Sequence, residues 1–251
     1  MIDQALMHPI KDRTFRFACR KDLPCFTRCC ANLNLVLTPY DVLRLKNRLN
    51  LSSEVFLERY AASYVDEKYG IPVVKLKMNK DETRRCPFVN PEGCVVYEDR
   101  PGACRLYPLG RASSKIYEGC RAEEYYFMVK ESHCLGLNEK QKWTVQEWLK
   151  DQGLDQYNIM NDFFMDITAG RQAKIIRRLN DRQLQMYYMA CYSLDDFRRF
   201  VFETSFLDRF DIRQDVLSRI KTDENELMAF ACQWLKFSLF GEKTFRLAAI
   251  Q

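Results

Sequence analysis

Two cysteine-rich stretches decide the character of this chain: residues 19–30 read CRKDLPCFTRCC and residues 86–108 read CPFVNPEGCVVYEDRPGACRLYP. Two further cysteines, Cys120 and Cys134, follow the second stretch, so nine of the 11 cysteines lie in the first 134 of 251 residues. Four thiols within residues 19–30 are more than the packing of an apolar core requires. Both stretches therefore predict a site that gathers sulfur atoms.

The start of the chain, MIDQALMHPIKDRTFRFACR, lacks the basic, apolar and small-residue regions of a secretory leader. No run of apolar residues is long enough to span a membrane. We therefore expect a cytoplasmic protein. In that reducing compartment cysteines rarely form disulfides and more often bind metals or act in catalysis.

The sulfur-rich region predicts a metal site, because soft metal ions bind deprotonated thiols strongly. The predicted ligands are Cys19, Cys25, Cys29, Cys30, Cys86, Cys94, Cys104, Cys120 and Cys134. Neighbouring residues of an extended segment point to opposite sides, so Cys29 and Cys30 fit poorly on a single ion. A polynuclear cluster fits this pair better, as do two adjacent sites, and eight thiols would complete two four-sulfur sites.

Arginines accompany the cysteines, and two of them are predicted to contact the bound cofactor. Arg100 lies between Cys94 and Cys104, and Arg105 directly follows Cys104. A cation near a thiol lowers its pKa and favours the thiolate that binds metal. It also offsets the negative charge of a thiolate-ligated cluster.

Iron–sulfur and zinc are the two candidates for the metal. Zinc sites often use cysteines separated by two residues together with histidine, whereas this chain has no such cysteine pair and only His133 near the cysteines. Irregular spacing and a surplus over four ligands favour an iron–sulfur cluster of the [4Fe-4S] type. Zinc is the alternative.

Outside the cysteines, the pattern predicts a mostly helical α+β fold. Residues 1–137 are expected to form a cysteine-cluster metal-binding domain and residues 138–251 a helical domain. In the first part, Thr38-Pro39 and Ser52-Ser53 are helix start signals, and Ile71–Met78 alternates like a strand. Shorter strands are expected at Cys94–Tyr97 and Lys115–Tyr117.

The second part is expected to be helical throughout. Thr144 and Glu147 form a capping-box pattern, with Gly153 as a stop signal. Four more helices are expected at Tyr157–Ile167, Asp181–Cys191, Leu194–Glu203 and Glu224–Phe240. Six further side chains have structural interpretations. Cys191 and Cys232 are expected to be buried small hydrophobes, and the pairs Glu123-Glu124 and Asp195-Asp196 to be helix caps or surface charges.

The distribution of charge along the chain indicates which classes of binding partner are expected. The net charge of +5 is mild and mixed along the chain, so we expect neither nucleic-acid binding nor membrane association. A protein partner is expected to dock on the helical half. Two histidines and no triad pattern argue against a hydrolase.

These motifs resemble the YkgJ-type cysteine-cluster family, whose pattern is CxxCxxCC followed by C…C…RPxxCRxYP. The resemblance covers about residues 15–121, and the spacing from Cys19 to Cys30 departs from the family pattern. It implies a zinc- or iron-chelating domain. The matching positions are Cys25, Cys29, Cys30, Cys86, Cys94, Arg100, Pro101, Cys104, Arg105, Tyr107 and Pro108.

The same resemblance extends distantly to the flagellin lysine-N-methylase, which implies an iron–sulfur cluster and S-adenosylmethionine. No glycine-rich strand-to-helix turn supports that nucleotide site, and the chain has only nine glycines. Three functions follow: an iron–sulfur protein with a redox, sensing or group-transfer role, an interaction module held by structural zinc, and a methyltransferase-like enzyme.

Overall fold

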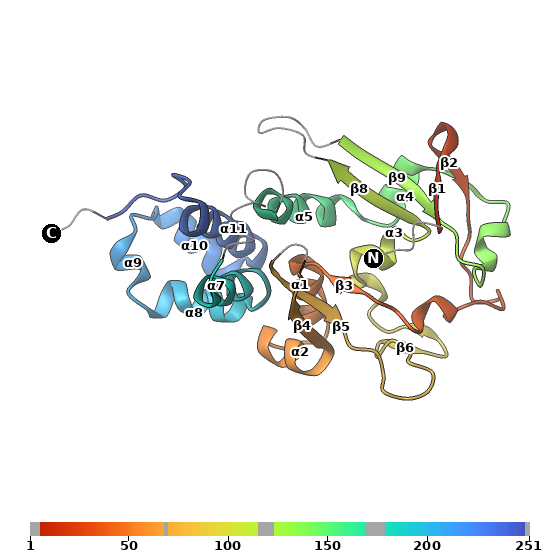
Figure 1. The fold of residues 1–251 in the computed structure, drawn as a ribbon, viewed down its shortest axis with the longest axis horizontal. Coiled ribbons are helices and arrows are strands. Elements are labelled where there is room, and N and C mark those ends of the chain that lie inside the picture. Colours follow the sequence, from red (N-terminus) through yellow and green to blue (C-terminus); the bar gives the residue numbers. More distant parts are fainter. Residues whose placement is uncertain (1–5, 68–69, 115–122, 169–178, 249–251) are drawn as a thin grey trace. The chain divides into compact units, whose positions relative to one another are not determined.

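The computed structural model describes residues 6–67, 70–114, 123–168 and 179–248 (Figure 1). It has a mostly helical α+β fold with small sheets, which confirms the predicted fold class. Cys120 and the strand predicted at Lys115–Tyr117 lie outside the described residues. Within them, no helix is both long and apolar enough to cross a membrane.

The chain divides into two compact units that interleave along the sequence. The cysteine unit comprises residues 1–36 and 75–158, and the helical unit comprises residues 37–74 and 159–251. The contiguous domains expected at 1–137 and 138–251 stay a prediction. The two compact units are defined by their internal contacts, and such a unit need not be a domain that folds independently.

Short strands build the cysteine unit. Its elements are β1 (Met7–Pro9), η2 (Lys11–Arg13), β2 (Thr14–Arg16), η3 (Arg28–Cys30), β6 (Val89–Asn90), β7 (Gly93–Cys94), η4 (Tyr97–Asp99), α3 (Gly102–Leu106), β8 (Leu109–Ser114), β9 (Glu123–Val129), η5 (Leu135–Asn138), β10 (Lys142–Thr144) and α4 (Val145–Asp151). Strands β1, β9 and β8 form an antiparallel sheet in that order, and β2 pairs with β10.

Two expectations for this unit are corrected. Strand β10 shows that residues 138–251 are not helical throughout: the pairing of Trp143 with Phe15 of β2 overrides the local preference. The strand expected at Cys94–Tyr97 ends at Cys94, because the chain turns there into η4.

An aromatic core holds α4 against the start of the chain. The rings of Phe15 and Phe17 meet Trp148 edge to face at 5.9 Å and 5.5 Å between centroids. The Trp148 indole N–H donates to the carbonyl of Leu106, at the end of α3, over 3.0 Å. Helix α4 begins with the predicted capping box of Thr144 and Glu147. The core therefore fixes α3, which carries Cys104.

The helical unit contains the helices predicted for its sequence. Its elements are α1 (Pro39–Arg48), α2 (Ser53–Tyr60), β4 (Ala61–Val65), α7 (Asp181–Tyr192), α8 (Leu194–Glu203), α9 (Phe206–Arg209), α10 (Gln214–Thr222) and α11 (Glu224–Phe240). Of these, β4, α9 and α10 were not predicted. Thr38 caps α1, Ser52 caps α2, and Gly241 at φ 69° ends α11, all as predicted. Cys191 and Cys232 are 3% and 6% exposed, which confirms that they are buried.

The chain passes from one unit to the other within three elements: β3 (Val36–Leu37), β5 (Pro72–Leu76) and α5 (Asp155–Thr168). Strand β5 confirms the strand expected at Ile71–Met78 and lies between β3 and β4 in a three-stranded sheet. Helix α5 confirms the helix expected at Tyr157–Ile167.

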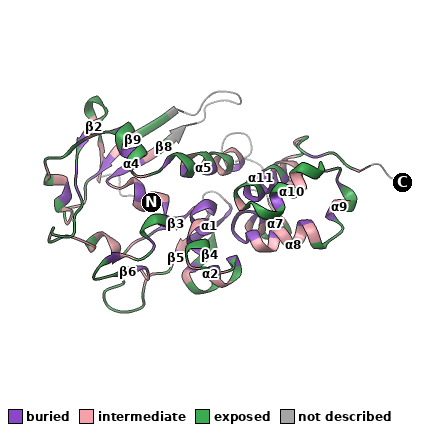
Figure 2. Cartoon of the chain, turned by 180° about the vertical axis from the view of Figure 1, so that it is seen from behind, coloured by how far each residue is buried: buried purple, intermediate pink, exposed green. Residues whose placement is uncertain are grey.

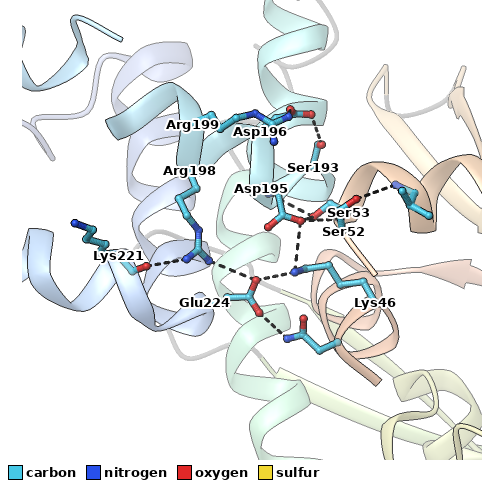
Figure 3. A network of polar contacts seen from close by, with 12 residues as sticks. Lys46, Ser52, Ser53, Ser193, Asp195, Asp196, Arg198, Arg199, Lys221 and Glu224 are labelled. Atoms are coloured by element: carbon cyan, nitrogen blue, oxygen red, sulfur yellow. Dashed lines mark hydrogen bonds and ion pairs between the residues drawn. The ribbon is translucent and has the colours of Figure 1, made fainter. Parts of the chain in front are cut away.

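Polar contacts join the helices of the helical unit (Figure 3). The buried Lys46 ammonium donates to the Glu224 carboxylate over 2.7 Å and lies 3.5 Å from the Asp195 carboxylate. Asp195 also accepts from the amide and hydroxyl of Ser53 over 2.7 Å and 2.8 Å. Asp195 is thus a helix cap, as predicted. Glu124 is a surface charge on β9 that binds Arg111 and Tyr126.

Candidate metal centre

The first cysteine stretch is a series of tight turns. The amides of Phe26 and Arg28 donate to the carbonyls of Leu23 and Cys25, over 2.8 Å and 2.9 Å. Thr27 adopts the left-handed conformation at φ 63°, immediately before η3. These turns fold the chain back so that the vicinal pair Cys29-Cys30 follows Cys25 closely in space.

Backbone pairing brings the second stretch to the vicinal pair. The Cys86 amide donates to the Cys30 carbonyl over 2.7 Å, and the Asn32 amide donates to the Arg84 carbonyl over 2.9 Å. Between them, Ala31 and Arg85 form an antiparallel bridge. Cys30 and Cys86 are therefore neighbours although 56 positions separate them in the sequence.

A hairpin in the second stretch places Cys94. Strands β6 and β7 pair with Val89 opposite Cys94. Gly93 has a φ of +125°, and a Cβ at this position would lie 3.3 Å from the ring of Phe26. Glycine is therefore required here for two reasons, its backbone conformation and the close approach of the first stretch.

Backbone amides point at three of the sulfurs. The Leu135 amide donates to the Cys25 sulfur over 3.3 Å. Burial raises the pKa of Cys86 and Cys94, and the amides of Phe88 and Val96, each two residues further along the chain, donate to these thiols and oppose that rise. Such bonds stabilise thiolates and tune the properties of metal–sulfur centres. The donor set therefore fits a thiophilic metal.

Pairwise electrostatic interactions, together with one backbone hydrogen bond, link eight cysteines into a set that we call the thiol neighbourhood; Cys104 joins it through Arg100. Its members are Cys19, Cys25, Cys29, Cys30, Cys86, Cys94, Cys104 and Cys134. Cys19 interacts with Cys25, Cys29 and Cys134. Cys86 interacts with Cys94, and both Cys94 and Cys104 interact with Arg100.

The vicinal pair joins the two parts of this neighbourhood. Cys29 forms a side-chain hydrogen bond with Cys30, and Cys30 accepts the backbone hydrogen bond from Cys86. In the described parts of the chain, however, no three His, Cys, Asp or Glu side chains converge as a bound ion would require. The assignment of individual ligands therefore stays a prediction.

Burial and mutual repulsion oppose ionisation of these thiols. Burial, assisted by the nearby thiols, raises the pKa of Cys19 to about 11. Burial likewise raises the pKa of Cys86 to about 11. The hydrogen bond with Cys30, followed by burial, raises the pKa of Cys29. A bound cation reverses this balance because it attracts the thiolates that otherwise repel one another.

Arg100 supplies positive charge within the neighbourhood. Its guanidinium donates to the Tyr97 carbonyl over 2.6 Å and to the Gln152 side chain over 2.5 Å, and lies 3.8 Å from the centre of the Tyr97 ring. Burial lowers its pKa, while Cys104 and Cys94 oppose that shift. Its charge in turn lowers the pKa of Cys19 and Cys94.

Arg105 positions the cysteine loop through backbone carbonyls. Its guanidinium donates to the carbonyls of Arg100 over 3.2 Å, Gln152 over 2.7 Å, and Glu98. It also lies over the Tyr157 ring, 4.8 Å from its centre. Arg105 is only 8% exposed and ties the segment before Cys104 to the end of α4. Its contact with a cofactor stays a prediction.

Three further residues belong to the site but were not among its predicted members. The Tyr107 hydroxyl is buried near Cys134 and Glu131, and burial, followed by its interaction with Cys134, raises its pKa. Glu131 also interacts with Cys29 and lies 3.6 Å from His133. In the sequence, the position of Glu131 three residues before Cys134 could have indicated that it lies near the cysteines.

The fold and the thiol neighbourhood define a cysteine-cluster metal-binding protein. Residues 18–135 match the model of the CxxCxxCC family, described as a putative zinc- or iron-chelating domain. This match confirms the resemblance, and the matched part of the chain contains all nine predicted ligands from Cys19 to Cys134. Searches of curated proteins and of solved structures find no match. The family description supports metal binding and names both zinc and iron.

Proposed function

We propose that the cysteine unit binds an iron–sulfur cluster of the [4Fe-4S] type that serves a redox, sensing or group-transfer role. The observation that carries this proposal is the thiol neighbourhood of eight linked cysteines, three of which (Cys19, Cys94 and Cys104) interact with Arg100. A mononuclear zinc site and a [4Fe-4S] cluster each use four cysteine ligands, so either one alone leaves half of these thiols unused. A cluster beside a second four-sulfur site would use all eight.

The surroundings of the sulfurs support this choice. When bound, an iron–sulfur cluster accepts and donates single electrons, and hydrogen bonds to its sulfurs adjust its reduction potential. The amides of Leu135, Phe88 and Val96 already point at cysteine sulfurs. Arg100 offsets the negative charge of the thiolates, and Arg105 holds the loop that carries Cys104.

Structural zinc is the second candidate. The loops around Cys25–Cys30 and around β6 contain little regular structure, and Figure 2 shows mostly half-buried and exposed residues along the loop at β6. Loops of this kind are often stabilised by a structural ion. A methyltransferase-like activity rests on the resemblance alone and requires measurable binding of S-adenosylmethionine.

Anaerobic purification of the full chain tests the proposal directly. Iron, zinc and acid-labile sulfide are measured per chain, together with the visible spectrum. We expect a brown protein with about four iron and four sulfide per chain for each cluster. A colourless protein with stoichiometric zinc and no sulfide would contradict the iron–sulfur assignment and support the structural ion.

Cysteine variants sharpen this measurement. Cys25→Ser removes a sulfur that the Leu135 amide contacts, so metal per chain should fall. Cys191→Ala changes a buried cysteine of the helical unit and serves as the matched control, with metal per chain unchanged. Equal loss in both variants would show that the effect comes from general destabilisation.

A further inference from the structure

The helical unit contains a pocket of about 510 Å³ that plays no part in the metal site. Helices α7, α8, α9 and α11 supply most of its lining residues. Small-molecule pockets in proteins commonly have volumes of about 300–1,000 Å³. The volume is therefore sufficient for a small organic ligand.

The interior of the pocket is apolar and largely aromatic. Its apolar lining consists of Met186, Met189, Phe200, Phe206, Phe210 and Trp234. The ring of Trp234 packs against Phe206 at 5.1 Å and against Phe210 at 5.2 Å between centroids, both edge to face. Because these rings brace one another, they form a stable wall for an apolar chain.

The polar part of the lining consists of Gln183, Gln185, Thr204, Ser205 and two cations. Arg182 lies in the first turn of α7, Arg209 ends α9, and both are exposed. In the part of the chain that the structure describes, no Asp or Glu lines the pocket. Within the described residues, neither guanidinium has a hydrogen bond or ion pair, whereas Arg198 and Arg219 of the same unit bind carboxylates. The positive end of the α7 dipole adds to this potential.

We propose that this pocket binds an amphipathic organic anion, with its carboxylate at Arg182 and Arg209 and its alkyl chain among the aromatic rings. Charge complementarity selects the headgroup, since guanidinium groups bind carboxylates through charge-assisted hydrogen bonds. The apolar wall selects the tail. Each further methylene that enters the pocket strengthens binding by about fourfold until the space is full.

Calorimetric titration of the metal-loaded full chain with sodium decanoate tests the proposal. The neutral analogue 1-decanol and the cationic decyltrimethylammonium are the comparison ligands. We expect saturable binding of decanoate, about tenfold weaker binding of decanol, and still weaker binding of the cation. Shorter carboxylates should bind progressively more weakly. This series reports on the pocket without any change to the protein.

Substitutions assign the headgroup site. Arg182→Gln and Arg209→Gln should each weaken decanoate binding by about three- to tenfold and leave decanol binding unchanged. Arg213→Gln is the matched control, because Arg213 is exposed and binds Asp215 instead of lining the pocket. Circular dichroism checks that each variant is folded.

Three results would overturn the proposal. The first is equal affinity for decanoate and decanol, and the second is decanoate affinity that neither pocket arginine affects. The third is binding of an acidic, apolar peptide without binding of decanoate, which would identify the pocket as a protein-docking site.

Discussion

The two units of the molecule hold their structure by different means. In the helical unit, large side chains such as Tyr187, Phe197 and Leu235 are completely buried, and helix caps fix the boundaries. In the cysteine unit, the aromatic core lies around Trp148, and the segments that carry the thiols are held by hydrogen bonds to carbonyls and sulfurs. From this difference we infer that a bound metal would stabilise the cysteine loops more than the helical unit.

Removal of the metal should produce the largest difference in stability between the two units. Because metal binding can contribute on the order of 10 kcal/mol to folding of its site, the cysteine loops should open when a chelator is added. We expect faster amide hydrogen exchange at residues 19–36 and 79–108. Helices α7, α8 and α11 should keep their protection, since their apolar core does not use the metal.

The loaded protein without chelator is the reference for this experiment. If both units lose protection equally after metal removal, their stabilities are coupled. That result would contradict the inference that the metal stabilises the cysteine loops and not the helical core.

Arg105→Met should produce the next largest effect and should act on the cysteine unit. The substitution keeps an apolar stem but leaves the carbonyls of Glu98, Arg100 and Gln152 without their buried donor. We expect a loss of about 3 kcal/mol in unfolding free energy and a lower metal content per chain. Denaturant titration and elemental analysis measure the two quantities.

Arg111→Met is the matched control for this substitution. Arg111 is a largely buried arginine of the same unit that contacts Glu124 and Asn158. Its replacement should preserve the metal content. Equal metal loss in both variants would show that Arg105 has no specific role in positioning the cysteine loop.

Leu235→Ala should act on the helical unit alone. Leu235 is fully buried in α11, so the truncation leaves a cavity that costs about 2–4 kcal/mol. We expect faster amide exchange in α7, α8 and α11, with metal per chain unchanged. Leu247→Ala, at a 70% exposed position, is the control with little expected effect. Loss of metal in Leu235→Ala would show that the helical core supports the metal site.

The same contrast explains which features the sequence predicts. Helix boundaries in the helical unit follow from local signals, such as the capping box at Thr38 and Asp41 and the glycine at 241. Strand β8, with the sequence LGRASS, has no alternation of apolar and polar residues. It forms through pairing with β9, which is a tertiary interaction. Short strands of this kind are not visible in local patterns.

The candidate site shows a similar division. The cysteines were identifiable because the packing of an apolar core does not require so dense a group of thiols, and the structure places eight of them in one neighbourhood. The role of Arg105 was not identifiable, because no sequence pattern tells which carbonyls a guanidinium will meet. The contacts of Tyr107 with Glu131 and Cys134 depend equally on the folded chain.

The smallest expected effect is a pH-dependent one at Asp195 in the helical unit. Burial alone would raise the pKa of this carboxyl group, but the amide and hydroxyl of Ser53 and the charge of Lys46 outweigh it and lower the pKa. A carboxylate with a lowered pKa stabilises the folded state above its unfolded pKa of about 3.9. This contribution is lost as the pH falls through the lower pKa of the folded state.

Asp195→Asn should therefore cost about 1 kcal/mol of local stability near pH 7, and the difference from the wild type should vanish at strongly acidic pH. Amide exchange of α2, compared between variant and wild type at each pH, measures this difference. Asp215→Asn is the control, because Asp215 binds Arg213 and Arg219 on an exposed surface of α10 and does not contact α2. A difference at Asp195 that is constant with pH would show that hydrogen-bond geometry, and not the carboxylate charge, stabilises the start of α2.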